Sequence, residues 1–203
     1  ETGIEAISLV ESPAIESNFI ALNSQKPKPI KFSTIDTEQR IVMGPALIPN
    51  KPIYRFMDNE EFYVFFSKKT VRMASEWYLK HGNQKKANIE HSEEMLEGIT
   101  LSETWIKEDM EKDKSAIYGM NDPIGTWMAS MKIDNDEVWN DYVKTGLVQG
   151  FSIEGFFADK GASKFTQKAK TLRDAQSVLT NHLSKTEILK HLDERNLNKQ
   201  NIK

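Results

Sequence analysis

The chain has 203 residues, of which 38% are apolar and 28% are charged, so it can bury a sizeable core and is not a wholly disordered protein. It contains no cysteine, which excludes disulfides, thiolate zinc sites and cysteine nucleophiles. No apolar run approaches the ~20 residues of a membrane-spanning helix, so no membrane partner is expected.

The charge is distributed unevenly along the chain. Residues 1–158 carry 17 Lys and Arg against 25 Asp and Glu, a net charge of −8. Residues 159–203 carry 10 against 5, a net charge of +5. This difference predicts a main domain over residues 1–158 and a basic extension over 159–203 with different partners. Nucleic acid is not favoured as a partner, because acidic residues are interspersed in the extension and Phe165 is its one aromatic residue.

The first half of the chain is predicted to be rich in strands. Runs of β-branched and aromatic residues indicate strands at residues 7–10, 18–22, 39–47 and 62–66. Two proline-containing stretches, residues 25–29 and 48–52, break the chain between them. Apolar residues at helical spacing then predict a helix from Ser67 to Leu79, which His81 and Gly82 end.

The second half is predicted to alternate strands with one helix. The expected elements are a short extended segment at 88–91, a strand at 99–106, a loop at 108–115, a strand at 125–133, a helix from 134 to 146 and a strand at 150–157. Alternation over 99–106 places Glu103 on an otherwise apolar face. Amphipathic patterns near residues 172–179 and after the capping box at 184–187 predict a helical extension.

Four histidines are available for chemistry. His182 and His191 belong to the predicted helices of the extension, without a suitable acidic cluster nearby. His81 falls where a helix ends, and a cation near the negative end of the helix dipole explains it. His91 alone falls on an extended segment between a helix and a strand, which makes it the candidate general base.

Two carboxylates directly follow His91 and raise the question of a metal site. Glu93 and Glu94 could each offer oxygen ligands. However, no second histidine stands at ligand spacing from His91, and zinc sites normally include one or more His or Cys ligands. The sequence therefore predicts no metal site.

Ser152 is the candidate nucleophile. It lies between Gly150 and Gly155 among bulky apolar residues, and glycine allows the close backbone approach that a nucleophile and an oxyanion hole require. A buried strand with a serine bonded to a neighbouring carbonyl explains the same pattern. The pattern is not the Gly-x-Ser-x-Gly elbow, because the second glycine is one residue too far away.

Three blocks of sequence in a fixed order resemble a known family. They are residues 7–14 (ISLVESPA), residues 90–92 (EHS) with 103–106 (ETWI), and residues 125–128 (GTWM) running to 150–155 (GFSIEG). In this order and spacing, they resemble the phage serine proteases of the XkdF-like group, which are relatives of the prohead proteases of tailed phages. The resemblance covers most of residues 4–157.

The resemblance implies a fold, a reaction and partners. The fold would be α+β, a small β-barrel or sandwich surrounded by helices as in the herpesvirus assemblins, followed by the helical extension. The family's histidine falls on His91 and its serine on Ser152, which implies peptide hydrolysis without a cofactor. The implied substrates are the scaffold and major capsid proteins, and the chain itself, inside the prohead assembling in the host cytoplasm. Self-association stays open.

The order of the blocks departs from that of the commoner prohead proteases. In those proteins the strand that resembles residues 6–14 follows the catalytic serine, so this chain resembles a circular permutation of them. The acidic residue expected to orient the histidine then aligns with Ala6. Glu103 is taken as the substitute because it is on the next predicted strand, although a rim carboxylate paired with a lysine explains it equally well. Ser8 and Glu154 are weaker candidates.

Two alternatives to an active protease remain at this stage. One is a protease fold that acts as a structural component of capsid assembly, and the other is a β-rich binding module in which His91 and Ser152 are incidental. The enzyme requires His91 within hydrogen-bond reach of Ser152, with looser geometry allowed at rest. The extension is either a solvated helix, a docking element for scaffold or capsid protein, or a segment removed during maturation.

Overall fold

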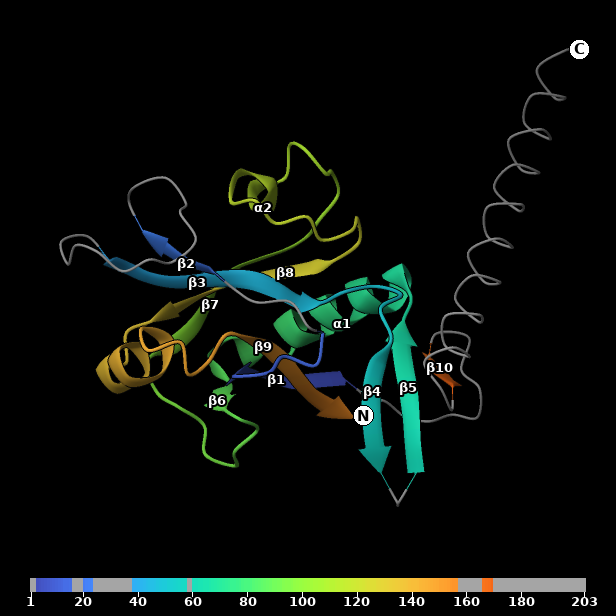
Figure 1. The fold of residues 1–203 in the computed structure, drawn as a ribbon, viewed down its shortest axis with the longest axis horizontal. Helices are drawn as coiled ribbons and strands as arrows, with labels where there is room; N and C mark the ends of the chain where they lie inside the picture. Colours follow the sequence, from blue (N-terminus) through green and yellow to red (C-terminus); the bar gives the residue numbers. More distant parts are fainter. Residues whose placement is uncertain (1–2, 16–19, 24–37, 58–59, 157–165, 170–203) are drawn as a thin grey trace, which may run out of the picture. The chain divides into compact units, whose positions relative to one another are not determined.

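The computed structural model of the protein describes residues 3–15, 20–23, 38–57, 60–156 and 166–169 (Figure 1). The chain divides into two compact units. The first contains Glu1–Lys51 and Phe66–Thr166, and the second contains Pro52–Phe65 and Gln167–Lys203. The described part is a mixed α+β structure with three sheets and few helices, and it contains no closed barrel.

The first unit contains a three-stranded sheet in the order β6-β1-β9. Strand β1 (Gly3–Val10) lies in the centre, parallel to β6 (Ala87–Ile89) and antiparallel to β9 (Gly150–Phe156). Seven of the eight residues of β1 are buried, which explains its almost continuous apolar run. Figure 1 shows these three strands together, although the sequence separates them widely.

The same unit contains a four-stranded antiparallel sheet in the order β2-β3-β8-β7. Its strands are β2 (Ile20–Asn23), β3 (Glu38–Leu47), β7 (Ile99–Ile106) and β8 (Trp127–Ile133). Strand β8 is buried on both faces except at Lys132. Its alternating side chains therefore contribute to the core on both sides of the sheet.

Helix α1 (Lys68–Lys80) is anchored to both sheets of the first unit. The Ser67 side chain caps its first turn by accepting from the backbone N–H of Thr70 at 3.1 Å. The ring of Tyr78 meets Trp127 of β8 edge-on at 5.6 Å between centroids, and burial raises the pKa of this tyrosine. Trp77 lies directly against Gly3 of β1. The helix is thus fixed by aromatic packing on two sides.

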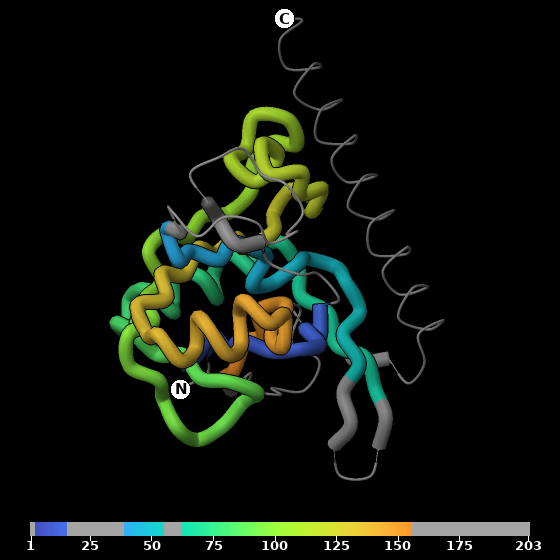
Figure 2. The backbone as a smooth tube through the Cα atoms, turned by 60° about the vertical axis from the view of Figure 1, so that its left-hand side comes forward, coloured from blue at the N-terminus to red at the C-terminus, as the bar shows by residue number. Residues whose placement is uncertain are grey.

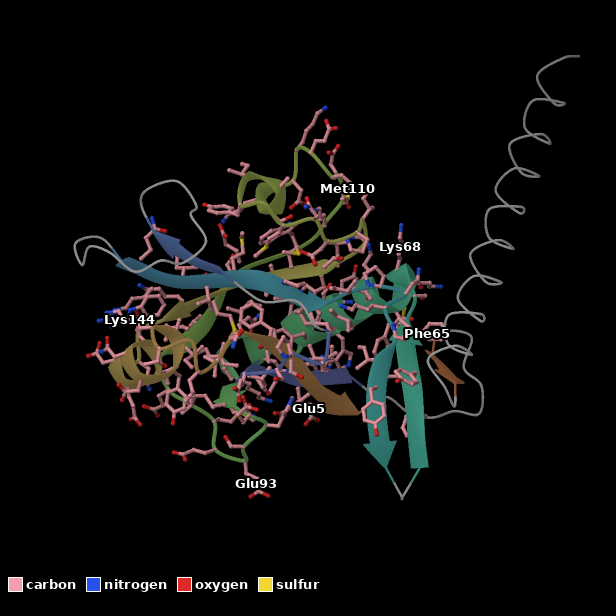
Figure 3. All side chains as sticks on the ribbon, in the orientation of Figure 1. Glu5, Phe65, Lys68, Glu93, Met110 and Lys144 are labelled. Carbon is pink, nitrogen blue, oxygen red and sulfur yellow. The ribbon has the colours of Figure 1, made fainter. Side chains whose placement is uncertain are left out.

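Three short helical segments complete the first unit. They are η1 (Asn83–Lys85), α2 (Lys114–Ile117) and the π-helix η2 (Val138–Val143). Figure 2 follows the chain from β6 through the loop of residues 90–98 to β7. That loop is exposed except for Leu96, which is half-buried. In Figure 3 Glu93 marks the outer end of the loop.

The second unit contains strand β4 (Ile53–Met57) and strand β5 (Glu60–Phe66) up to Phe65, and the two strands pair as an antiparallel hairpin. Tyr54 and Tyr63 are partners across it, with their rings edge-on at 5.7 Å between centroids. Strand β10 (Thr166–Ala169) adds to β5 to give the sheet order β10-β5-β4.

Most of the predicted elements of the first unit are confirmed. The strands expected at 7–10, 39–47 and 99–106, the helix from Ser67 and the strand at 150–157 all exist within a few residues of their predicted bounds. Strand β5 confirms the prediction at 62–66, whereas β4 was not predicted. The helix expected after residue 134 is a π-helix, and α2 begins inside the expected loop at 108–115.

Several predictions fall on residues outside the described part. They are the start of the strand at 18–22, the break at 25–29 and the amphipathic helices near 172–179 and after 184. The described piece of the basic extension, residues 166–169, is a strand where a helical extension was expected. Short segments take a strand conformation when a sheet edge offers partners, which local periodicity does not reveal.

A β-bulge in β7 turns Glu103 away from its expected face. Leu101 pairs with Met131 and Glu103 pairs with Ser130, so Ser102 is an extra residue on β7. The bulge reverses the alternation beyond it, and Glu103 lies on the opposite face from Leu101. The prediction that the two share an apolar face is therefore wrong.

Candidate functional site

Strand register brings three polar residues to one face of the sheet β6-β1-β9. Ser8 of β1 pairs with Ser152 of β9 on one side and with Asn88 of β6 on the other. Residues directly opposite each other on paired strands project from the same face. Glu154 lies two residues beyond Ser152 on β9 and pairs with Ala6, so its side chain projects from that face too.

A turn directly after β6 brings His91 to the same place. Glu90 and His91 have φ angles of 51° and 58°, in the left-handed region, so the prediction of an extended segment at these two residues is wrong. Non-glycine residues in this region each cost about 1–3 kcal/mol, and such strain often occurs at functional sites. A hydrogen bond from Ser92 N to Ile89 O, 3.0 Å long, closes the turn.

The side chains of His91, Glu154 and Ser8 are joined by hydrogen bonds. His91 Nδ1 lies 2.8 Å from Glu154 Oε1 and 3.1 Å from Ser8 Oγ. Ser8 Oγ in turn donates to Glu154 Oε1 at 2.7 Å. Three segments that are distant in sequence thus meet at one carboxylate oxygen. The structure brings His91 together with Glu154 and Ser8, the two residues that ranked behind Glu103 as candidates in the sequence analysis.

The pattern of donors assigns the tautomer of His91. An ionised carboxylate only accepts hydrogen bonds, and the single hydroxyl proton of Ser8 is used in its bond to Glu154. The bonds of His91 Nδ1 to both oxygens therefore require a proton on Nδ1. In the neutral imidazole this leaves a lone pair on Nε2. Nε2 is thus the nitrogen that can accept a proton.

Hydrogen bonding keeps Glu154 ionised. Burial by itself would raise the pKa of Glu154, but the hydrogen bonds that it receives and the charge of His91 outweigh this effect. The net result is a pKa below the ordinary value for glutamate. Near neutral pH the group that faces His91 is consequently a carboxylate, which can orient the imidazole and stabilise its protonated form.

Ser152 lies on this sheet face with a nearly buried side chain. Its exposed fraction is 7%, and its hydroxyl forms no hydrogen bond with the residues that the structure describes. No direct hydrogen bond joins Ser152 to His91 in this part of the chain either. The two residues thus reach the same face of the sheet, with Ser8 next to both, and no direct hydrogen bond joins them among the described residues.

Close approach of two strands explains the glycine after Glu154. A Cβ atom at Gly155 would lie 2.1 Å from Gly3 O and 2.7 Å from the Cα atom of Ile4. Any larger residue would push β9 away from β1 directly beside Glu154, where Gly155 is opposite Ile4. The sequence indicated a need for close approach around Ser152, and the structure places that need at Gly155.

Glu103, the third member of the triad suggested by the sequence, lies elsewhere in the fold. It is on β7 in the other sheet, where it forms an ion pair with Lys114 at the surface. The hydrogen bond from Lys114 lowers the pKa of Glu103. The carboxylate in contact with His91 is Glu154 instead. The spacing Ser-x-Glu on a predicted strand contained this signal, because alternate residues share a face.

Neither a metal nor a membrane is indicated by the described residues. Among them, no group of three or more His, Cys, Asp or Glu side chains is placed to hold a metal ion. None of the helices that the structure describes is long and apolar enough to cross a membrane.

Comparisons with family models, with curated protein sequences and with solved structures gave no match for this chain.

Proposed function

We propose that the chain is a serine endopeptidase in which Ser152 is the nucleophile and His91 is the general base, with Glu154 as the carboxylate that orients His91. The observation that carries this proposal is the 2.8 Å contact between His91 Nδ1 and Glu154 Oε1 at the sheet face that bears Ser152. A serine nucleophile needs a histidine that donates a hydrogen bond from one ring nitrogen to a carboxylate and has a lone pair on the other ring nitrogen.

In the proposed reaction, His91 Nε2 accepts the proton of Ser152 Oγ while this oxygen attacks the carbonyl carbon of a peptide bond. The protonated imidazole, stabilised by Glu154, then gives that proton to the leaving amine. Water then attacks the acyl-enzyme. His91 accepts a proton from this water and gives it to Ser152 Oγ as the ester bond breaks. Catalytic hydrogen bonds are often long at rest and tighten when substrate binds, which accommodates the absence of a direct hydrogen bond between Ser152 and His91 among the described residues.

Ser8 is a poorer nucleophile than Ser152, although it is the serine in contact with His91. Ser8 is fully buried, and its proton is used in the bond to Glu154. It also faces Nδ1, the nitrogen that carries the proton. We therefore assign Ser8 the task of holding Glu154, and Ser152 that of attacking the substrate.

The proposed substrates are the scaffold and major capsid proteins of a tailed phage, on a circularly permuted assemblin-like fold. This part of the proposal rests on the resemblance of the three sequence blocks. The pairing of β1 with β9 supports the permutation, because antiparallel neighbours are commonly joined by a short hairpin. In this chain almost the whole main domain separates β1 from β9 in sequence. This is expected if the permutation placed the chain ends where a connection between the two strands would otherwise be.

An inactive structural component is the second candidate. The observation that favours it is the absence of a direct hydrogen bond between Ser152 and His91 among the described residues. In such a protein the same buried polar cluster would serve only to hold three strands in register.

Co-expression with the scaffold and major capsid proteins of the phage separates the two candidates. The full chain, Ser152→Ala, His91→Ala and the control Glu103→Gln are expressed in parallel, and intact masses are recorded. The proposal predicts discrete shortened products with the full chain and the control, and none with the Ser152 and His91 variants. Uncut masses in all four samples would favour the structural component.

A further inference from the structure

Asn88 uses both protons of its amide to join two parts of the candidate site. It is fully buried in β6, and its Nδ2 donates to Glu154 Oε1 at 2.8 Å and to the backbone oxygen of Ser92 at 2.9 Å. Both partners are acceptors, so the orientation of the amide is fixed by the network. One side chain therefore connects the carboxylate on β9 to the residue directly after His91.

The bond to Ser92 acts on the turn that presents the imidazole. The turn contains two consecutive non-glycine residues, Glu90 and His91, in the left-handed region, a conformation that persists only where its surroundings hold it. Asn88 spans the turn from β6 to Ser92 O. Glu90 secures the other side, since its Oε1 accepts from the backbone N–H of Glu11 at 2.5 Å.

The bond to Glu154 acts on the charge that faces the imidazole. Together with Ser8 and His91, Asn88 supplies one of three hydrogen bonds that offset the burial of this carboxylate. Ser8 and Asn88 are neighbours across paired strands, so the two donors reach the carboxylate from adjacent strands.

We propose that Asn88 is a positioning residue of the protease site. It holds the His91 turn and the Glu154 carboxylate in one arrangement, so that Nδ1 of His91 keeps its proton and Nε2 stays available as the base. The inference rests on the proposed function, but its effect on the tautomer of His91 can be measured without any substrate.

The chain offers a matched control in Asn83. This residue is also buried, its Nδ2 donates to a backbone oxygen (Ile4 O, 3.1 Å), and its Oδ1, like that of Asn88, has no partner among the described residues. Neither the side-chain nor the backbone hydrogen bond of Asn83 involves His91 or Glu154. Asn83→Ala and Asn88→Ala therefore remove similar buried amides, and only the second should change the site.

The test measures the ring nitrogens of His91 by ¹⁵N NMR in the full chain, with His91→Gln used to assign the signals. We expect His91 to carry its proton on Nδ1 in the unmodified chain and in Asn83→Ala. In Asn88→Ala we expect a mixture of the two His91 tautomers. Asn88→Asp, which keeps the volume but replaces the donor with a second carboxylate, should also lose the single tautomer. An unchanged tautomer in folded Asn88→Ala would overturn the inference.

A second readout is the rate at which a fluorophosphonate probe labels the chain. Asn88→Ala should label about 10–100-fold more slowly than the unmodified chain, because a misplacement of a catalytic group by about 1 Å can cost roughly 100-fold in rate. In a Glu154→Gln background the same substitution should slow labelling less, because the part of its effect that runs through Glu154 is already lost and only the bond to Ser92 O remains to be removed. Equal losses in both backgrounds would contradict the action of Asn88 on Glu154. Failure of the unmodified chain to label would instead count against the proposed function, and the NMR result would still decide the role of Asn88.

Discussion

The two sheets of the first unit both carry a glutamate on a strand, and the two glutamates have different surroundings. Glu103 on β7 forms an ion pair with Lys114 at the surface. Glu154 on β9 accepts hydrogen bonds from Ser8, Asn88 and His91, which come from three other segments. A surface ion pair contributes about 0–1 kcal/mol and needs no further partner. A carboxylate held by three donors fixes the orientation of a histidine.

The hydroxyl groups of the two sheets differ in the same way. On β7, Ser102 and Thr104 donate to backbone oxygens of the neighbouring strand β8 at 3.0 and 2.9 Å. On β1, Ser8 donates to a carboxylate. The bonds of Ser102 and Thr104 only give each hydroxyl a hydrogen-bond acceptor on the neighbouring strand. The bond of Ser8 belongs to a network whose members depend on one another, which is why we place the chemistry there.

The largest expected effect distinguishes the two glutamates. Glu154→Gln should lower proteolytic turnover by about 10³–10⁴-fold, because an amide in this position can favour the wrong imidazole tautomer. Glu103→Gln should leave turnover within about twofold of that of the unmodified chain, since the partner of Glu103 is a surface lysine. Cleavage of the co-expressed capsid and scaffold proteins, followed by mass spectrometry, measures both. Similar losses of turnover in the two variants would contradict the different roles assigned to Glu154 and Glu103.

The next effect concerns the strand spacing beside Glu154. Gly155→Ala should lower the free energy of unfolding by about 1–3 kcal/mol, because the added methyl group would overlap the backbone of Gly3 and Ile4. Thermal and urea unfolding of the full chain measures this loss. Stability equal to that of the unmodified chain would show that β9 does not need this close approach.

A smaller effect is expected from the hydroxyl groups. Ser8→Ala removes one donor to Glu154 and should lower the fluorophosphonate labelling rate by about tenfold, equivalent to ~1.4 kcal/mol and typical of one hydrogen bond to a charged group. Ser102→Ala is the matched control on the other sheet and should label at the unmodified rate. Complete loss of labelling in Ser8→Ala would instead favour Ser8 as the nucleophile.

The smallest effect is a dependence of stability on pH. The pKa of Glu154 is below its ordinary value of 4.5 in the folded chain, so the unfolded chain binds the proton more readily. The stabilisation is therefore complete above about pH 4.5 and is lost as the pH falls through the folded pKa. Glu154→Gln should flatten the decline in the free energy of unfolding below this pH. A decline as steep as in the unmodified chain would contradict the assigned ionisation.

Local patterns predicted most of the elements of the first unit. Apolar periodicity located β1, β3, β7 and α1, because each is buried on a face or along a stripe. The bulge at Ser102 was not visible in the sequence, and one inserted residue was enough to reverse the face of Glu103. Strand β4 was missed because its run is short and lies next to a proline-containing turn.

The site was predictable only in part, for a physical reason. His91 and Ser152 were selected by their local context and by the resemblance. Asn88 was not selected, because its role depends on the register of β6 against β1 and on contacts with residues far along the chain. Glu154 was noticed without a reason to prefer it over Glu103. Long-range pairing decides which polar residues meet, and single-sequence periodicity does not contain that information.

The most direct test of the account is to locate the residue that a fluorophosphonate modifies in the full chain. Peptide mapping by mass spectrometry after labelling identifies the serine, with His91→Ala treated in parallel. The account predicts an adduct on Ser152 that forms in the unmodified chain and is lost, or strongly slowed, in His91→Ala. An adduct on Ser8, or no adduct on any serine of the chain, would contradict it.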